Sequence, residues 1–176
     1  APSIMAGNVV LLKHAPNVSQ CSKEIASAFL QAGAMHGLFQ SLIVDIKVTE
    51  KIIAHDIVQG VTLTGSEMAG SSVAALAGKY IRKSVLELGG SDPLIVLEDA
   101  DLEKAAKVAM QSRMQNTGQS CIASKRFIVL ESVKEAFQEQ LILVADKIQQ
   151  GNQLHPETTM GPMARADLAK KLEQQQ

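Results

Sequence analysis

The sequence lacks the features that mark several classes of protein. It has two cysteines, Cys21 and Cys121, too few for a disulfide framework and too far apart for a zinc site. Its 17 basic and 18 acidic residues give no basic field for nucleic acid or an anionic membrane. Apolar runs such as Leu141–Val144 are far shorter than the roughly 20 residues of a membrane span. The histidines show no metal-ligand spacing. We therefore expect a cytoplasmic protein that binds no metal, nucleic acid or membrane.

What is present indicates a packed fold. Apolar residues make up 46% and charged residues 20% of the chain, a balance that argues against disorder. Apolar runs that read as strands alternate with segments of helical periodicity. The expected strands are 9–12, 60–64, 85–88, 93–97 and 126–130, with a weaker one at 38–44. The expected helices are 21–33, 47–55, 67–80, 99–115 with Asp99 as N-cap, and a long one opened by a capping box of Ser132 and Glu135 that ends before Gly151. This alternation predicts an α/β protein with a parallel sheet covered on both faces.

The two ends predict an internal segment of a longer chain. Ala1 is not an initiator methionine, and the opening residues do not resemble a signal peptide. Residues 165–176 read as a helix that stops in mid-pattern. Parts of any functional site could therefore lie outside the segment.

Polar residues follow several of the expected strands, where parallel sheets bind ligands. Lys13 could contact a nucleotide ribose or phosphate, or be a solvated surface lysine. Gly65 and Ser66 open a helix whose first amides suit a pyrophosphate, although the same junction also fits an ordinary capped turn. The GxGxxG fingerprint of a standard Rossmann phosphate loop is absent from the sequence.

Two further residues carry reactive groups. Glu87 lies within an apolar run, so it is either a buried carboxyl whose pKa rises enough for a general base, or an edge-strand residue that faces water. Cys121 lies between a loop and a strand, where a thiol can act as a nucleophile, although most cysteines are inert core residues. Cys21, on the apolar stripe of its helix, is expected to be such an inert core residue.

Four motifs in order resemble the aldehyde dehydrogenase superfamily, particularly its bacterial succinate-semialdehyde dehydrogenase-like branch. They are GNVVLLKHAPN (7–17), TLTGSEMAG (62–70), LELGGSDP (86–93) and QNTGQSC (115–121), and the GPM turn at 161–163 extends the resemblance. The resemblance implies oxidation of an aldehyde to a carboxylic acid with NAD or NADP. Succinate semialdehyde is the leading substrate, and the full-length protein is expected to be a dimer or tetramer.

The resemblance also assigns roles to individual residues. Cys121 matches the nucleophile that forms a thiohemiacetal and then a thioester, and its backbone amide matches one oxyanion donor. Glu87 matches the base that activates water, which disfavours a CoA-acylating enzyme. Lys13 matches the contact to the adenosine ribose, Gly65 and Ser66 match the pyrophosphate turn, and Leu88 is assigned to the cofactor site. Residues 1–88 would be the C-terminal part of a Rossmann-like NAD(P)-binding domain, and 89–176 the N-terminal part of an α/β catalytic domain.

Three residues depart from the family pattern. Pro16 stands where many NAD-preferring members carry a glutamate, which leaves NADP open. Gln115 stands where several succinate-semialdehyde dehydrogenases have an arginine for the substrate carboxylate, and Met114 replaces a frequently aromatic residue. An oxyanion asparagine and a ribose glutamate are expected outside the segment, so the 176 residues alone are expected to be inactive. The alternative function is a non-catalytic nucleotide-binding remnant.

Overall fold

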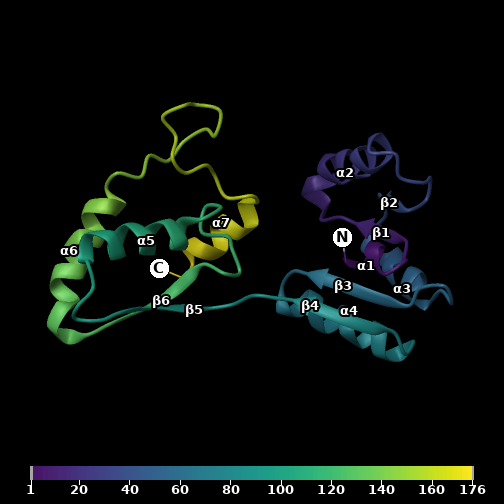
Figure 1. Cartoon of the computed structure of the whole chain (residues 1–176), viewed down its shortest axis with the longest axis horizontal. Helices are drawn as coiled ribbons and strands as arrows, with labels where there is room; N and C mark the ends of the chain where they lie inside the picture. Colours follow the sequence, from purple (N-terminus) through teal and green to yellow (C-terminus); the bar gives the residue numbers. More distant parts are fainter. Residues whose placement is uncertain (1, 176) are drawn as a thin grey trace. The chain divides into compact units, whose positions relative to one another are not determined.

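The computed structural model describes residues 2–175, and these form two compact units (Figure 1). One unit comprises the chain up to Leu63 together with Met68–Leu86, and the other comprises Thr64–Glu67 together with the chain from Glu87 onward. No helix among the described residues is long and apolar enough to cross a membrane. Residues 2–175 also contain no cluster of three or more histidine, cysteine or acidic side chains that could hold a metal ion.

The chain as far as residue 87 alternates strands and helices. Its elements are α1 (Pro2–Met5), β1 (Val10–Lys13), the 3-10 helix η1 (Pro16–Val18), α2 (Ser19–Gln31), β2 (Phe39–Leu42), α3 (Ile46–Ala54), β3 (Gly60–Thr64), α4 (Glu67–Lys79) and β4 (Lys83–Glu87). β1 and β2 pair in parallel, and β3 pairs with β4 in a second small sheet. α2 connects β1 to β2, and the ring of Phe29 stacks on that of Phe39 with centroids 4.7 Å apart.

Cys21 is exposed, so the prediction that it is a core residue was wrong. The side of α2 that packs inward begins one residue later, at Ser22, whose exposed fraction is 2%. The hydroxyl of Ser22 hydrogen-bonds to that of Ser41 on β2. Ile25, on the predicted stripe, is 44% exposed. The contacts that join α2 to β2 therefore include this hydroxyl pair and the stacked rings of Phe29 and Phe39, while Cys21 and Ile25 are exposed.

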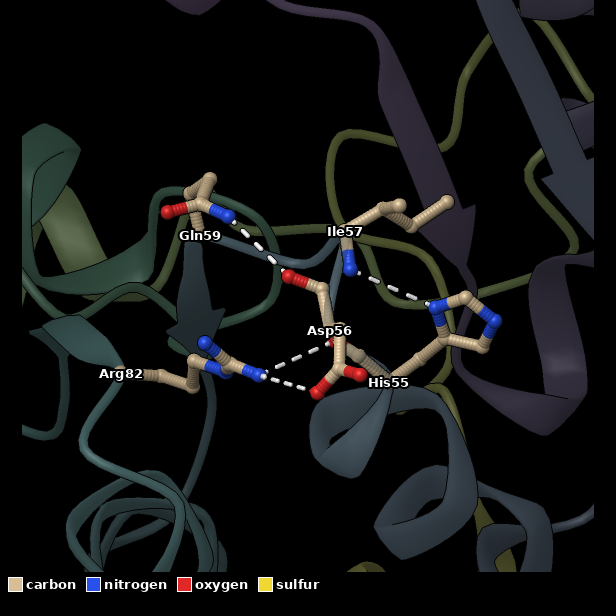
Figure 2. A network of polar contacts seen from close by, with 5 residues as sticks. All are labelled: His55, Asp56, Ile57, Gln59 and Arg82. Atoms are coloured by element: carbon tan, nitrogen blue, oxygen red, sulfur yellow. Dashed lines mark hydrogen bonds and ion pairs between the residues drawn. The ribbon is translucent and has the colours of Figure 1, made fainter.

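A polar network joins the segment after α3 to the segment after α4 (Figure 2). The Arg82 guanidinium donates to the His55 carbonyl at 3.2 Å and lies 3.7 Å from an Asp56 carboxylate oxygen. The Gln59 side chain donates to the Asp56 carbonyl at 3.1 Å, and the Ile57 amide donates to the His55 ring at 3.4 Å. These bonds hold the two connections that lead into β3 and β4.

The second unit has one sheet and three α-helices. Its elements are β5 (Asp92–Val96), α5 (Leu102–Met114), β6 (Ser124–Val129), the 3-10 helix η2 (Glu131–Val133), α6 (Lys134–Ala145) and α7 (Ala166–Glu173). β5 and β6 pair in parallel, as the alternating pattern predicts. Val96, Ala106, Ala109 and Phe137 form the buried core between this sheet and α5 and α6. The rings of Phe137 and Phe127 meet edge to face at 6.3 Å.

Within the second unit, the described helices pack on one face of the β5–β6 sheet, so the expectation of two covered faces is not met there. Ile95 and Ile128, which are paired across the strands, are 63% and 50% exposed. Both helices pack on the opposite face, beside Leu94 and Val96. Alternation along each strand then turns the isoleucines outward.

Two predicted helix starts were wrong. α5 is capped by Asp101, whose side chain accepts from the Lys104 amide at 3.1 Å, rather than by Asp99. The predicted capping box at Ser132 does not form: residues 131–133 make the 3-10 helix η2, and α6 follows without a side-chain cap. α6 also ends at Ala145, well before Gly151.

Candidate active site

A cavity of about 520 Å³ lies within the second unit. Its volume is within the range of sites that bind small molecules. Three segments line it: Thr64–Gly65 at the end of β3, Leu88–Gly90 after β4, and the 115–121 turn together with Lys125. Cys121 is the cysteine among the lining residues of this cavity.

The cavity brings together three residues that the sequence singled out. Gly65, Leu88 and Cys121 all line it, although the first and last are far apart in the chain. The Gly65 amide donates to the Glu87 carbonyl at 3.0 Å, which joins the first two segments. Ser66 follows Gly65 directly, and α4 begins at the next residue.

The thiol of Cys121 is exposed and forms no disulfide. It follows a turn and precedes Ala123, which is completely buried and fixes the chain where β6 is about to begin. Gly90 approaches the Cys121 backbone so closely that a Cβ at position 90 would lie 2.8 Å from the Cys121 carbonyl oxygen. Glycine is therefore required at position 90 to let the two segments meet.

The turn before the thiol adopts an unusual backbone. Asn116, Thr117 and Gly118 all have positive φ, at 52°, 57° and 73°. Positive φ is ordinary for glycine and tolerated by asparagine, but it is strained for a β-branched threonine. Such strain persists only where surrounding contacts fix the conformation.

Contacts from two sides hold this turn. The Arg113 guanidinium donates to the Gly118 carbonyl at 3.1 Å. The Thr117 hydroxyl donates to the Gly161 carbonyl at 3.3 Å, and the Ala164 amide donates to the Gln119 side chain at 3.2 Å. The end of α5 and the 161–164 segment therefore brace the turn that presents Cys121.

Lys125 is the one charged side chain among the residues that line the described cavity. Its ammonium donates to three backbone carbonyls, those of Ser120 at 2.8 Å, Cys121 at 3.0 Å and Ala123 at 3.3 Å. An ammonium has three N–H donors, so these contacts engage all of them. Lys125 therefore holds the protein backbone and has no donor left for a ligand carboxylate.

Glu87 is placed differently from the buried alternative raised by the sequence. It is the last residue of β4, and its side chain is exposed. It is not among the residues that line the cavity, although its neighbour Leu88 is. The structure thus brings the Cys121 thiol to the cavity without the Glu87 carboxylate. Of the two alternatives raised by the sequence, the structure therefore agrees with the carboxylate that faces water.

Lys13 belongs to the first unit and ends β1. Its half-buried side chain donates to the carbonyl of the next residue, His14, at 2.7 Å. Its predicted contact with a cofactor ribose stays a prediction.

Sequence reasoning did not identify Lys125 or the bracing role of Arg113. The signal for Lys125 was a lysine four residues after the cysteine, at the start of an apolar strand. Nothing in the sequence indicated that this lysine turns back toward the loop. The bond from Arg113 to the Gly118 carbonyl depends on the tertiary structure, and no motif in the sequence indicates it.

Two similar proteins align with nearly the whole chain, including the residues that line the cavity. A probable NADP-dependent succinate-semialdehyde dehydrogenase of Synechocystis sp. is 54% identical over 168 residues, which are 96% of this chain and 37% of that protein. The succinate semialdehyde dehydrogenase Sad of Escherichia coli K12 is 47% identical, with 99% of this chain and 38% of that protein covered.

A solved structure of a protein with a related name also matches this chain. The succinic semialdehyde dehydrogenase of Streptococcus pyogenes in complex with NADP+ superposes with a TM-score of 0.95 at 39% identity. The match covers 99% of this chain and 38% of that one. The chain therefore spans well under half the length of these relatives.

The segments that line the cavity all lie within the region matched by one family model. The family model described as the aldehyde dehydrogenase family matches residues 1–176. The chain belongs to the aldehyde dehydrogenase family.

Proposed function

We propose that the protein that carries this sequence oxidises an aldehyde to a carboxylic acid, with NAD+ or NADP+ as hydride acceptor and Cys121 as nucleophile. The observation that carries the proposal is an exposed thiol in a cavity of ligand size, on a chain of this family. Exposure lets an aldehyde reach the sulfur, and the braced turn fixes the direction of attack.

The first step is attack of the Cys121 thiolate on the aldehyde carbonyl, which forms a thiohemiacetal. The carbonyl oxygen becomes an oxyanion and needs a hydrogen-bond donor already in place. The Cys121 amide suits this role because no hydrogen bond from it to another group is present among the described residues. Loss of hydride then leaves a thioester on Cys121.

The second step is hydrolysis of the thioester, for which Glu87 is the proposed base. A carboxylate that removes a proton from water makes it a better nucleophile. Glu87 directly precedes Leu88, which lines the cavity, and its side chain is exposed. The reaction releases the acid and restores the thiol.

The nicotinamide cofactor supplies the hydride acceptor when it is bound. Gly65 and Ser66 precede α4, a helix of 13 residues whose amino end carries a partial positive charge suited to a pyrophosphate. Gly65 lines the cavity and presents no side chain, so the residues fit a close approach by phosphate. Leu88 would pack beside the cofactor, and Lys13 would contact the adenosine ribose. The name of the Synechocystis relative specifies NADP+, and the name of the Escherichia coli relative allows NAD+ or NADP+.

Succinate semialdehyde is the leading substrate because the two relatives described above carry that name. The cavity itself lacks an arginine for the distal carboxylate: Gln115 lines it, and the Arg113 guanidinium is held by Gly118. Within the described residues, the side-chain amide of Gln115 is then the group at this position for the distal carboxylate of the substrate. Residues outside this chain are expected to supply the charge.

The test uses the product of the complete reading frame that contains this sequence. Succinate semialdehyde, butanal and acetaldehyde are each supplied with NAD+ or NADP+, and formation of the reduced nucleotide is followed at 340 nm in both the parent and Cys121→Ala. The proposal predicts turnover by the parent, fastest with succinate semialdehyde, and a loss of at least about 1,000-fold in the variant. Undiminished turnover by Cys121→Ala would refute the nucleophile. A parent that binds nucleotide without turnover would favour the non-catalytic remnant.

A further inference from the structure

We propose that Lys125 is a positioning residue that aims the Cys121 amide at the oxyanion. This inference rests on the proposed function, because it concerns how the same thiol is presented. Lys125 touches neither the thiol nor, in this account, the substrate. It acts through the backbone carbonyls that accept its hydrogen bonds.

The planarity of the peptide group links Lys125 to the oxyanion donor. The Ser120 carbonyl and the Cys121 amide belong to one peptide unit, which is planar, and no cis peptide bond occurs among the described residues. In a trans peptide the C=O and N–H bonds point in opposite directions. The bond from Lys125 to the Ser120 oxygen, at 2.8 Å, therefore also sets the direction of the Cys121 N–H.

A second contact reinforces this orientation. The Ala123 amide donates to the same Ser120 oxygen at 3.3 Å and closes a short turn. Lys125 also holds the Cys121 carbonyl at 3.0 Å, so the peptide units on both sides of the Cys121 Cα are fixed. With both units fixed, the amide cannot rotate away as negative charge develops on the substrate oxygen.

The strand pairing explains why the lysine turns back. In the parallel register, Asp92 pairs with Ser124 and Pro93 pairs with Arg126, so Lys125 is an extra residue on β6. Such a bulge redirects a side chain, and bulges are common next to active sites. Without the bulge, alternation along β6 would place Lys125 differently relative to the turn. The sequence position alone therefore gave no sign of this role.

The test distinguishes two possible roles of Lys125: orienting the Cys121 amide, or only keeping the turn around Cys121 ordered. 4-Nitrophenyl acetate acylates a thiol through a tetrahedral oxyanion, whereas iodoacetamide alkylates it by direct displacement with no oxyanion. The complete protein is reacted with each reagent, without nucleotide. Release of 4-nitrophenolate is followed by stopped flow, and alkylation of Cys121 is followed by mass spectrometry.

Lys125→Met keeps the aliphatic stem and removes the ammonium. The inference predicts that its acylation rate falls at least about tenfold, because complete loss of an oxyanion donor costs about 100- to 1,000-fold. Its alkylation rate should stay within about twofold of the parent, because displacement needs no oxyanion donor. Lys125→Arg, which retains a cation and N–H donors, should retain more of the acylation rate than Lys125→Met. Lys104→Met, an exposed lysine on α5, is the matched control and should leave both rates unchanged.

An equal fall in both rates for Lys125→Met would mean that the lysine only keeps the turn ordered, and would overturn the inference. Unchanged acylation would overturn it as well. Should Lys125→Met fail to fold, Lys125→Gln is measured in its place under the same criteria. Cys121→Ala is run alongside: acylation that persists in that variant contradicts the proposed nucleophile, a failure distinct from that of Lys125.

Discussion

Gly90 is the residue at which the smallest change should have the clearest effect on the site. A Cβ at position 90 would lie 2.8 Å from the Cys121 carbonyl oxygen, a backbone atom that cannot move without shifting the thiol. We expect Gly90→Ala to slow acylation of Cys121 at least about tenfold, because small displacements of reacting groups can cost about 100-fold in rate. Stopped-flow measurement with 4-nitrophenyl acetate checks this.

Gly78→Ala is the control for that substitution. A Cβ at Gly78 would meet nothing within 4 Å, and the residue lies inside α4, where alanine is favoured over glycine. The control should acylate at the parental rate. A Gly90→Ala variant that does the same would show that the approach of residue 90 to the thiol segment is not required.

At the residue scale, site residues that lie in recognisable motifs were predictable from the sequence, and residues whose role depends on tertiary contacts were not. Gly65 was found by its place after an expected strand and Cys121 by its place between a loop and a strand, and both line the cavity. Of the two alternatives for Glu87, the exposed one holds, because an apolar run shows that a strand is present but not which of its faces is covered. Lys125 could not be predicted, because its position depends on a bulge in the strand pairing.

At the scale of elements, the start of α5 gives a test within one short segment. Asp101 caps the helix through the Lys104 amide at 3.1 Å, whereas Asp99, two residues earlier, is exposed and outside the helix. We expect Asp101→Ala to lower the free energy of unfolding by about 1 kcal/mol, the usual cost of losing an N-cap. Asp99→Ala is expected to change it little. Thermal unfolding of both variants measures which aspartate caps α5. Equal destabilisation by the two substitutions would contradict Asp101 as the cap.

Most elements were predictable from periodicity because short apolar runs and spaced apolar residues report burial directly. Their ends were less predictable. Asp99 and Asp101 are chemically equal candidates, and only the backbone conformation chooses between them. Ser132 and Glu135 have capping-box spacing, but the chain makes a 3-10 turn there first. The inward face of α2 was predicted only in part: Phe29 stacks on Phe39 of β2, but Ser22 is buried against Ser41 while Cys21 is exposed.

At the scale of the whole molecule, the chain forms two compact units and spans 37% and 38% of the length of two relatives. The α/β class with parallel pairing was predictable from alternation. Coverage of both sheet faces was not, because composition does not say which parts of a chain supply each layer. The assignment of residues 1–88 to a cofactor domain and 89–176 to a catalytic domain remains a prediction.

In the proposed reaction, Cys121 carries the acyl group and Glu87 promotes its release. The most direct measurement is mass spectrometry of the complete Glu87→Gln protein, quenched during reaction with succinate semialdehyde and NADP+. Glutamine cannot accept the proton from water, so the thioester should accumulate. We expect a succinyl adduct on the peptide that contains Cys121, longer-lived than in the parent. Absence of that adduct, with steady-state turnover equal to that of the parent, would contradict the proposed reaction.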